Sequence, residues 1–159
     1  MTDFLDKMFY DPTSPSFLRW GWNEKCPRVT RKSVGGLDRS TGYYVFYSSE
    51  KKFYCHRVIW EIFNGPIPEG MEIDHKDGNR INNNIDNLRL ATKSQNMINR
   101  PKVCSQRFKG VYPNHDRFMT RIMVDGKDVY LGTYDTQEEA YEVYKEAAIK
   151  YHGEFARLE

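Results

Sequence analysis

Hydrophobic and aromatic positions in the first half of the chain indicate two strands followed by a helix. Residues 43–47 and 52–55 are rich in aromatic side chains and flank a short polar segment, which predicts two strands joined by a turn. Apolar residues at helical spacing then predict a helix over 56–64, which Gly65 and Pro66 end. The first forty residues combine turn formers with weak periodicity, so no strand or helix is predicted there.

The next segment predicts the order strand, strand, helix. Two short strands are expected at 71–75 and 88–91, with a polar loop over 76–86 between them. Thr92 opens a T-x-x-Q capping pattern and therefore marks the start of a helix, which ends before Pro101.

The last third of the chain predicts a second module. Three strands are expected at 109–112, 117–124 and 129–133. A helix follows, because Thr136 opens a T-x-x-E capping box, and Gly153 is expected to end it. The residues that recur at helical spacing on one face of this helix are Ala140, Tyr144, Ala147, Ala148 and Tyr151.

These elements predict an α+β protein with two domains. We assign the first domain, which includes an N-terminal strand extension, to residues 1–100, a polar linker without periodicity to 101–107 and the second domain to 108–159. The second domain is expected to be a small three-stranded antiparallel sheet packed on one helix.

The strand predicted at 117–124 has two different faces, because side chains alternate along a strand. Arg117, Met119, Arg121 and Met123 alternate with Phe118, Thr120, Ile122 and Val124. If the helix covers the apolar set Phe118, Ile122, Val124, Val129 and Leu131, the open face carries Lys109, Arg117, Arg121 and Tyr130. That cationic face could meet DNA, since basic side chains on a sheet can hold phosphates while the sheet lies in the major groove.

Charge is distributed unevenly along the chain. The formal net charge is only +2, but the segment 19–57 holds nine basic residues against three acidic ones. The segment 135–150 reverses the balance, with five acidic residues against two lysines. A small total charge is therefore compatible with a phosphate-binding surface and an acidic opposite side.

Composition also indicates the cellular compartment of the protein. No apolar run approaches the roughly 20 residues of a membrane span, and the opening residues lack the pattern of a secretory signal, so we expect a cytoplasmic protein, in the host cell if it is phage-borne. Cys26, Cys55 and Cys104 are odd in number and widely spaced, which favours free thiols and argues against a zinc site. No obligate protein partner is indicated.

Asp74, His75 and Asn96 form the pattern with the clearest chemistry. Asp74 and His75 end one predicted strand, and Asn96 lies on the helix after the next strand. Carboxylate and amide oxygens suit Mg²⁺, which binds to a few such ligands and keeps water and phosphate in its remaining positions. His75 can act as a general base, because an imidazole with a pKa of about 6.5 is available in neutral form near pH 7.

The same segment resembles the HNH endonucleases of the phage- and intron-encoded homing branch. The motif residues are D-H-K-D-G-N from Asp74, the asparagines that follow, N-L-R from Asn87, and Asn96. This resemblance implies a ββα-metal fold, one divalent cation (Mg²⁺, with Mn²⁺ possible) bound by Asp74 and Asn96, His75 as base and Asn87 as the residue that orients the loop. Asn96 replaces the final histidine of many HNH proteins, as it does throughout this branch.

Other interpretations of these residues remain open. The Asn, Asp and Gly residues of the loop could form ordinary turns, and the D-G-N triplet lacks the spacing of a calcium-binding loop. His56 and Arg57 resemble the family's H-R-x-x-W element, in which they organise the loop or contact DNA, although a purely structural role is favoured for His56. Asn99 could either cap the helix or touch a phosphate.

The second module resembles the ethylene-response-factor (Apetala-family) DNA-binding domain. The resemblance rests on K-G-V from Lys109, V-Y-L-G-T-Y from Val129, D-T-Q-E-E-A-Y from Asp135 and the segment from Ala147. It implies a DNA-binding face consisting of Lys109, Tyr112, Arg117, Arg121, Met123 and Tyr130. The family's first-strand residues are replaced at 112–115, so the target sequence cannot be transferred, and a solvated charged sheet face is the alternative.

Together these features predict an endonuclease that cuts or nicks double-stranded DNA with one divalent metal and a histidine base. The alternative is a DNA-binding regulator that keeps an inactive HNH fold. An enzyme acting on RNA has no specific feature in its favour. The sequence leaves open the recognition site, nick against double-strand break, the oligomeric state, the preferred metal and the role of residues 1–40.

Overall fold

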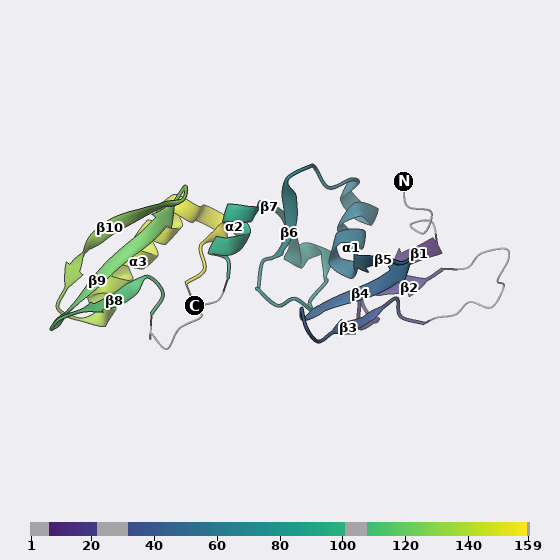
Figure 1. Cartoon of the computed structure of the whole chain (residues 1–159), viewed down its shortest axis with the longest axis horizontal. Helices are drawn as coiled ribbons and strands as arrows, with labels where there is room; N and C mark the ends of the chain where they lie inside the picture. Colours follow the sequence, from purple (N-terminus) through teal and green to yellow (C-terminus); the bar gives the residue numbers. More distant parts are fainter. Residues whose placement is uncertain (1–6, 22–31, 101–107, 159) are drawn as a thin grey trace. The chain divides into compact units, whose positions relative to one another are not determined.

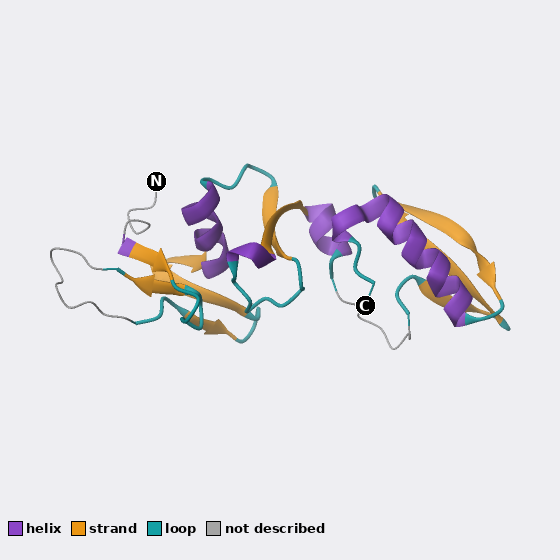
Figure 2. Cartoon of the chain, turned by 180° about the vertical axis from the view of Figure 1, so that it is seen from behind, coloured by secondary structure: helices purple, strands orange, loops and turns teal. Residues whose placement is uncertain are grey.

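The computed structural model describes residues 7–21, 32–100 and 108–158, which form two compact units. The units are Met1–Ala91 and Thr92–Glu159 (Figures 1 and 2). The predicted linker 101–107 lies outside the described residues. The predicted helix after Thr92 groups with the second unit, whereas the sequence assigned it to the first domain.

The first unit begins with a hairpin that the sequence did not predict. β1 (Met8–Tyr10) pairs antiparallel with β2 (Leu18–Trp20). Strands of three residues are too short to show a period of two against a background of turn formers, which explains why periodicity missed them.

A three-stranded antiparallel sheet follows, in the order β3-β4-β5. The strands are β3 (Gly36–Asp38), β4 (Tyr43–Ser48) and β5 (Lys51–Tyr54), and α1 (Cys55–Asn64) comes directly after them. The predicted strands at 43–47 and 52–55 and the predicted helix at 56–64 are confirmed to within one residue. Gly65, at φ 80°, ends α1 in a conformation that favours glycine.

The core of the first unit lies between α1, the hairpin and the sheets. It consists of Met8, Leu18, Val34, Phe46, Cys55, Val58, Ile59, Ile73 and Leu88. Burial raises the pKa of the Cys55 thiol to about 12, so this cysteine is a free thiol that behaves as an apolar core residue. Cys26 and Cys104 lie outside the described residues.

The predicted order strand, strand, helix is confirmed. β6 (Met71–His75) pairs with β7 (Leu88–Thr92), the 3₁₀ turn η2 (Ile85–Asn87) precedes β7, and α2 (Lys93–Ile98) follows it. Thr92 and Gln95 form a complete capping box at the start of α2. Asn99 is the buried C-cap residue of α2, which agrees with the capping role considered above.

The second unit contains a three-stranded antiparallel sheet packed on one long helix, as predicted. The strands are β8 (Val111–Asn114), β9 (Arg117–Val124) and β10 (Lys127–Tyr134), in the order β10-β9-β8, and α3 (Gln137–His152) is followed by the 3₁₀ turn η3 (Gly153–Phe155). Figure 2 shows α3 along one face of the sheet. Strand β8 starts two residues later than predicted, because Gly110 turns the chain at φ 74° against the ring of Tyr144.

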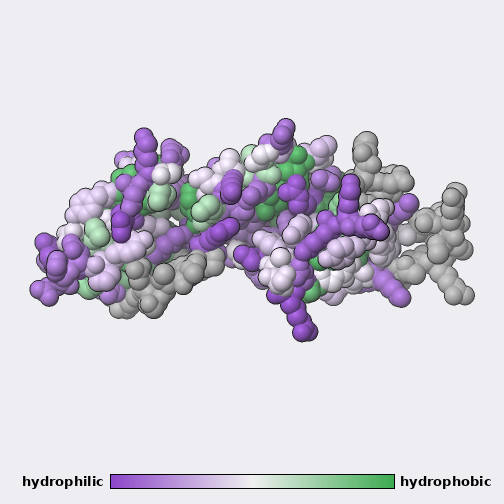
Figure 3. Space-filling view, viewed as in Figure 1, coloured by the Kyte–Doolittle hydropathy of each residue, from purple (hydrophilic) through white to green (hydrophobic). Residues whose placement is uncertain are grey.

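The predicted division of the sheet into two faces is largely confirmed. Ile122 is buried with Tyr144, Ala147 and Ala148, and Val124, Val129 and Leu131 pack against this cluster. Phe118 is only partly buried and is not a member of the cluster. Hydrophilic side chains dominate the surface of both units in the view of Figure 3. In the described part of the chain, no helix is long and apolar enough to cross a membrane.

Candidate active site

Asp74 and His75 end strand β6, and the fold buries both of them. Only 5% of Asp74 and 3% of His75 is exposed. Side chains of consecutive strand residues point to opposite faces, so the side chains of Asp74 and His75 lie in different surroundings. Asp74 is directed to β7 and His75 to the loop after β6.

Arg89 on β7 holds the Asp74 carboxylate. Its Nε and Nη2 atoms lie 2.9 Å and 2.8 Å from Oδ2 of Asp74. Buried carboxylates remain charged only where such a partner compensates them. Arg89 belongs to the N-L-R motif, but no local spacing in the sequence relates it to Asp74.

His75 is placed in an environment that keeps its ring neutral. Burial lowers the pKa of His75 below its usual value, and Arg80 adds to this effect, while the hydrogen bond to Asn83 and the nearby Asp77 and Asp74 carboxylates oppose it. A neutral imidazole at pH 7 is the form that a general base requires.

The rings of Tyr43 on β4 and His56 on α1 lie beside His75. The ring centroids of Tyr43 and His56 lie 5.9 Å and 5.1 Å from that of His75. The guanidinium of Arg80 lies over the Tyr43 ring at 5.1 Å and donates a hydrogen bond to the carbonyl of Thr41 at 2.9 Å. The loop after β6 is therefore attached to the sheet beside the histidine.

His56 occupies the structural role that the sequence favoured for it. Its ring packs against Tyr43 and Tyr54, with centroids 4.9 Å and 5.6 Å away, and its Nδ1 atom is buried with no hydrogen-bond partner in the described part of the chain. Burial, followed by the charges of His75 and Arg57, lowers the pKa of His56 to about 3. Arg57 is only partly buried, so its predicted contact with DNA stays a prediction.

Asn87 joins the two ends of the loop between β6 and β7. Its amide nitrogen donates to Oδ1 of Asp77 at 3.0 Å and to the carbonyl of Asn82 at 2.8 Å, and its Oδ1 accepts from the backbone N–H of Asp77 at 3.1 Å. The backbone N–H of Asn79 also donates to Asp77. The loop thus does use ordinary turn chemistry, and these turns hold the backbone that follows His75 in place.

Asn96 lies on α2, in the second unit, and is partly buried. The structure therefore brings Asp74, His75 and Asn87 together within the first unit, and the joining of Asn96 to them stays a prediction. Among the described residues there is no group of three or more His, Cys, Asp and Glu side chains that could hold a metal ion. The predicted pair, one carboxylate and one amide, would not form such a group, and its oxygen atoms are the donors that Mg²⁺ prefers.

Most of the DNA-binding residues predicted in the second unit lie on the open face of its sheet. Met123 and Tyr130 are 53% and 62% exposed, and the side chains of Arg117 and Arg121 are 53% and 41% exposed. Arg121 lies over the ring of Tyr112 at 4.6 Å. Both arginines are paired with exposed acids of the same unit, namely Asp135 at 2.7 Å and Asp128 at 2.9 Å.

Lys109 differs from its predicted position on that open face. The residue precedes β8, and its Nζ atom donates to the carbonyl of Ile98 at the end of α2, at 2.6 Å. Burial, followed by the charge of Arg157, lowers the pKa of Lys109. The predicted alternation does not extend to Lys109, because the first strand begins at Val111 and not at residue 109.

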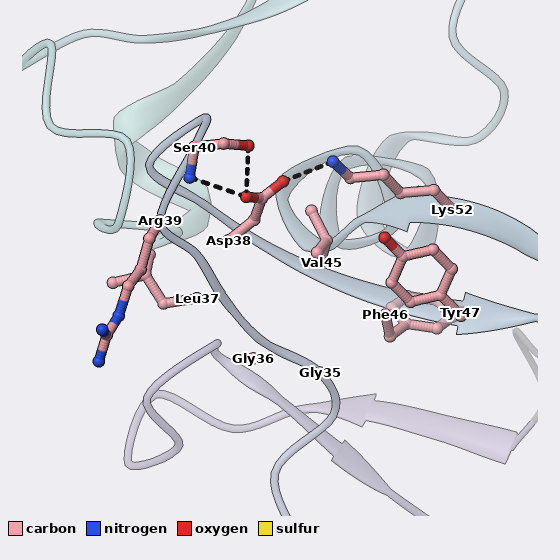
Figure 4. A pocket seen from close by; sticks show the side chains of 10 residues that line it. All are labelled: Gly35, Gly36, Leu37, Asp38, Arg39, Ser40, Val45, Phe46, Tyr47 and Lys52. Carbon is pink, nitrogen blue, oxygen red and sulfur yellow. Dashed lines mark hydrogen bonds and ion pairs between the residues drawn. The ribbon is translucent and has the colours of Figure 1, made fainter.

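A separate groove of about 770 Å³ lies over β3, β4 and β5 (Figure 4). Hydrogen bonds from Lys52 and Ser40 hold the pKa of the Asp38 carboxyl well below its usual range. No predicted site residue lines this groove, whose walls are Gly35, Gly36, Leu37, Asp38, Arg39, Ser40, Val45, Phe46, Tyr47 and Lys52.

Comparisons with known proteins identify the segment that carries the site. The HNH endonuclease family model matches residues 53–98, which run from β5 to the end of α2. The chain is 37% identical over 120 residues to "Protein 3.8" of Escherichia phage T7, and the match covers 73% of this chain and 96% of that protein. The chain therefore contains an HNH endonuclease domain. It belongs to the same family as Protein 3.8 of phage T7.

Two other kinds of relative match part of the chain. "Uncharacterized HNH endonuclease L560" of Acanthamoeba polyphaga mimivirus is 36% identical over 118 residues, or 73% of this chain, which spans 62% of that protein. "AP2-like ethylene-responsive transcription factor ANT" of Arabidopsis thaliana is 48% identical over 50 residues, which amount to 29% of this chain and 9% of that protein. The first relative agrees with the HNH prediction, and the short second match gives weaker support to the predicted DNA-binding module.

Proposed function

We propose that this protein is a metal-dependent endonuclease that hydrolyses phosphodiester bonds of double-stranded DNA. The observation that carries the proposal is the pairing, at the end of β6, of a buried carboxylate fixed by Arg89 with a histidine kept neutral by burial. Both groups lie within the segment that matches the HNH endonuclease family. Phosphodiester hydrolysis needs these two functions, a base for water and a hard oxygen ligand for a cation.

In this proposal each residue has one task. His75 takes a proton from the attacking water, and Asn87 holds the loop that carries His75 by its bonds to Asp77 and Asn82. Asp74 and Asn96 hold one divalent cation, Mg²⁺ or Mn²⁺. When bound, that cation stabilises the negative charge that develops on the phosphate oxygens.

The place of Asn96 in the chain supports its assignment as the second ligand. Strand β7, which carries Arg89, ends at Thr92, and α2 begins at the next residue. Thr92 and Gln95 form a capping box that fixes the first turn of α2. Asn96 is the residue directly after Gln95. The ββα-metal arrangement is thus part of the proposal, with β6, β7 and α2 as its elements.

The second unit is proposed to bring the nuclease to its DNA site. The open face of its sheet combines Arg117 and Arg121 with exposed Tyr130 and Met123, while α3 covers the other face. A sheet with this composition can contact phosphates and base edges. The domain limits 1–100 and 108–159 and the linker between them remain part of this proposal.

The test is a cleavage assay on the purified full chain. Supercoiled and linear phage DNA is incubated with Mg²⁺, with Mn²⁺ or with a chelator, and new ends are sequenced on both strands. We expect metal-dependent cutting that is lost in Asp74→Ala and His75→Ala and kept in Asp86→Ala, which changes an exposed acid on η2 of the same unit. Cutting by the Asp74 and His75 variants at the rate of the parent protein would refute the proposal.

A DNA-binding regulator with an inactive HNH fold is the second candidate. The match of part of the chain to plant proteins named transcription factors favours it. A gel-shift experiment with and without metal separates the two functions, since a regulator retains DNA in both conditions and produces no new ends.

A further inference from the structure

Asn83 connects His75 to the N-terminal hairpin. It lies in the loop between β6 and β7, and its side chain is fully buried. Its Oδ1 atom is 3.0 Å from Nε2 of His75, and its Nδ2 atom is 3.3 Å from the backbone carbonyl of Ser16, which lies 67 positions earlier in the chain. From the sequence, Asn83 is expected only to take part in an ordinary turn, and no contact between it and the hairpin is predicted.

The direction of these two hydrogen bonds is determined by the carbonyl of Ser16. A carbonyl oxygen can only accept, so the group of Asn83 that faces it must be the NH₂ group. The amide oxygen of Asn83 then faces His75 and can itself only accept. Nε2 of His75 must therefore carry the proton, and in a neutral imidazole this leaves the lone pair on Nδ1.

The turn between β1 and β2 holds the carbonyl of Ser16 in place. Ser16 and Leu18 are fully buried, and the hydroxyls of Ser14 and Ser16 donate to the carbonyl of Leu18 at 2.8 Å and 3.3 Å. The backbone N–H of Phe17 donates to the carbonyl of Ser14 at 2.9 Å. The hairpin supports the loop a second time, because the hydroxyl of Tyr10 donates to Oδ1 of Asn84 at 3.4 Å.

We propose that Asn83 is a positioning residue that fixes His75 as the Nε2–H tautomer, with the β1-β2 turn as the support that sets the orientation of the Asn83 amide. This inference rests on the proposed function in one respect, namely that His75 is the base. Nδ1 is then the atom that takes the proton from water. The role explains why a polar amide occupies a fully buried position, since both of its ends are hydrogen-bonded.

The first test determines the tautomer directly. The full-length protein is labelled with ¹⁵N in histidine, and long-range ¹H–¹⁵N correlation spectra are recorded near pH 7 without metal or DNA. We expect the protonated nitrogen of His75 to be Nε2. A proton on Nδ1, or an even mixture of the two tautomers, would overturn the inference, and this result needs no variant to fold.

The second test uses variants of the amide. Asn83→Leu keeps the size of the side chain and removes the acceptor, so we expect tautomer mixing and a fall in kcat of about 10- to 100-fold with KM little changed, as for other residues that orient a functional group. Asn83→Asp keeps an acceptor oxygen for Nε2 and should retain the Nε2–H tautomer, but it loses the donor to the carbonyl of Ser16, so we expect only a partial recovery of kcat relative to Asn83→Leu. The matched control is Asn64→Leu, which changes an exposed asparagine at the end of α1 whose side chain donates to the carbonyl of Trp60.

Unchanged tautomer and unchanged kcat in a folded Asn83→Leu protein would refute the role of Asn83. The spectra are independent of cleavage, so a protein that never cuts DNA would count against the proposed function while the tautomer result still decides the inference. Conversely, normal cleavage with a proton on Nδ1 would retain the function and refute the inference.

Discussion

The guanidinium of Arg89 holds the carboxylate of Asp74 with two nitrogen atoms, at 2.9 Å and 2.8 Å from the same oxygen. Both side chains are at least 90% buried within the first unit. A charged pair in such surroundings gains much of its stability from the geometry of its hydrogen bonds, because removing two charges from water is costly. The proposed metal ligand is thus oriented by the protein's own residues.

Loss of Arg89 should destabilise the first unit strongly. Arg89→Leu leaves an uncompensated buried carboxylate, and the expected loss is about 3–5 kcal/mol in the free energy of unfolding. Urea denaturation of the parent and the variant measures this difference. Arg117→Leu, which removes an exposed ion pair, is the control and should cost at most about 1 kcal/mol. Equal losses of unfolding free energy in the two variants would show that the buried ion pair is no more stabilising than the exposed one.

Asp74 should also determine whether a divalent cation stabilises the protein. A ligand that binds the folded state raises the melting temperature by mass action. We expect Mn²⁺ to raise the melting temperature of the parent and of Asp86→Asn, but to have little effect on Asp74→Asn. Differential scanning fluorimetry with a metal series measures this. A full metal response in Asp74→Asn would place the cation elsewhere.

His56 should make the folded state sensitive to acid. The groups that face it are Tyr43, Tyr54, His75 and Arg57, none of them an acid that would stabilise a charged ring. Its folded pKa of about 3 lies below the unfolded value of 6.5, so the unfolded state binds more protons between these values. The stability that His56 contributes is complete above pH 6.5 and is lost as the pH falls toward 3, at about 1 kcal/mol per pH unit.

His56→Gln should therefore show a smaller dependence of unfolding free energy on pH in that window. Urea denaturation at several pH values between about 4 and 7 measures the slope for both proteins. His115→Gln, which changes a histidine exposed on the surface, is the control. An identical slope in His56→Gln and the parent would contradict the assignment.

Arg117 and Arg121 should contribute to DNA affinity through phosphate contacts. Each of Arg117→Ala and Arg121→Ala is expected to weaken binding by about 1 kcal/mol and to reduce the salt dependence of binding by about one unit of slope. Fluorescence anisotropy at several salt concentrations measures both quantities. Lys150→Ala, on the last turn of α3 behind the sheet, removes an equal charge and should change neither. An equal loss in Lys150→Ala would indicate general charge attraction without a binding face.

The local order of the elements could be predicted from the sequence because its signals lie within a few residues of one another. The capping boxes at Thr92 and Thr136 start α2 and α3 where predicted. The alternation in 117–124 separates the buried Ile122 from the exposed Met123. Asp74 and His75 could be selected as candidates because their chemistry is visible in the residues themselves.

The partners of those residues were decided only by the tertiary structure. Arg89 is 15 positions from Asp74, and the carbonyl of Ser16 is 67 positions from Asn83, so no periodicity or cap relates them. The same holds for Lys109, whose ammonium is directed by the end of α2. The sequence by itself determined which groups could do chemistry, because that depends on residue type and local spacing. Only the folded chain decided their charge partners and hydrogen-bond directions, because these depend on segments that meet through core packing.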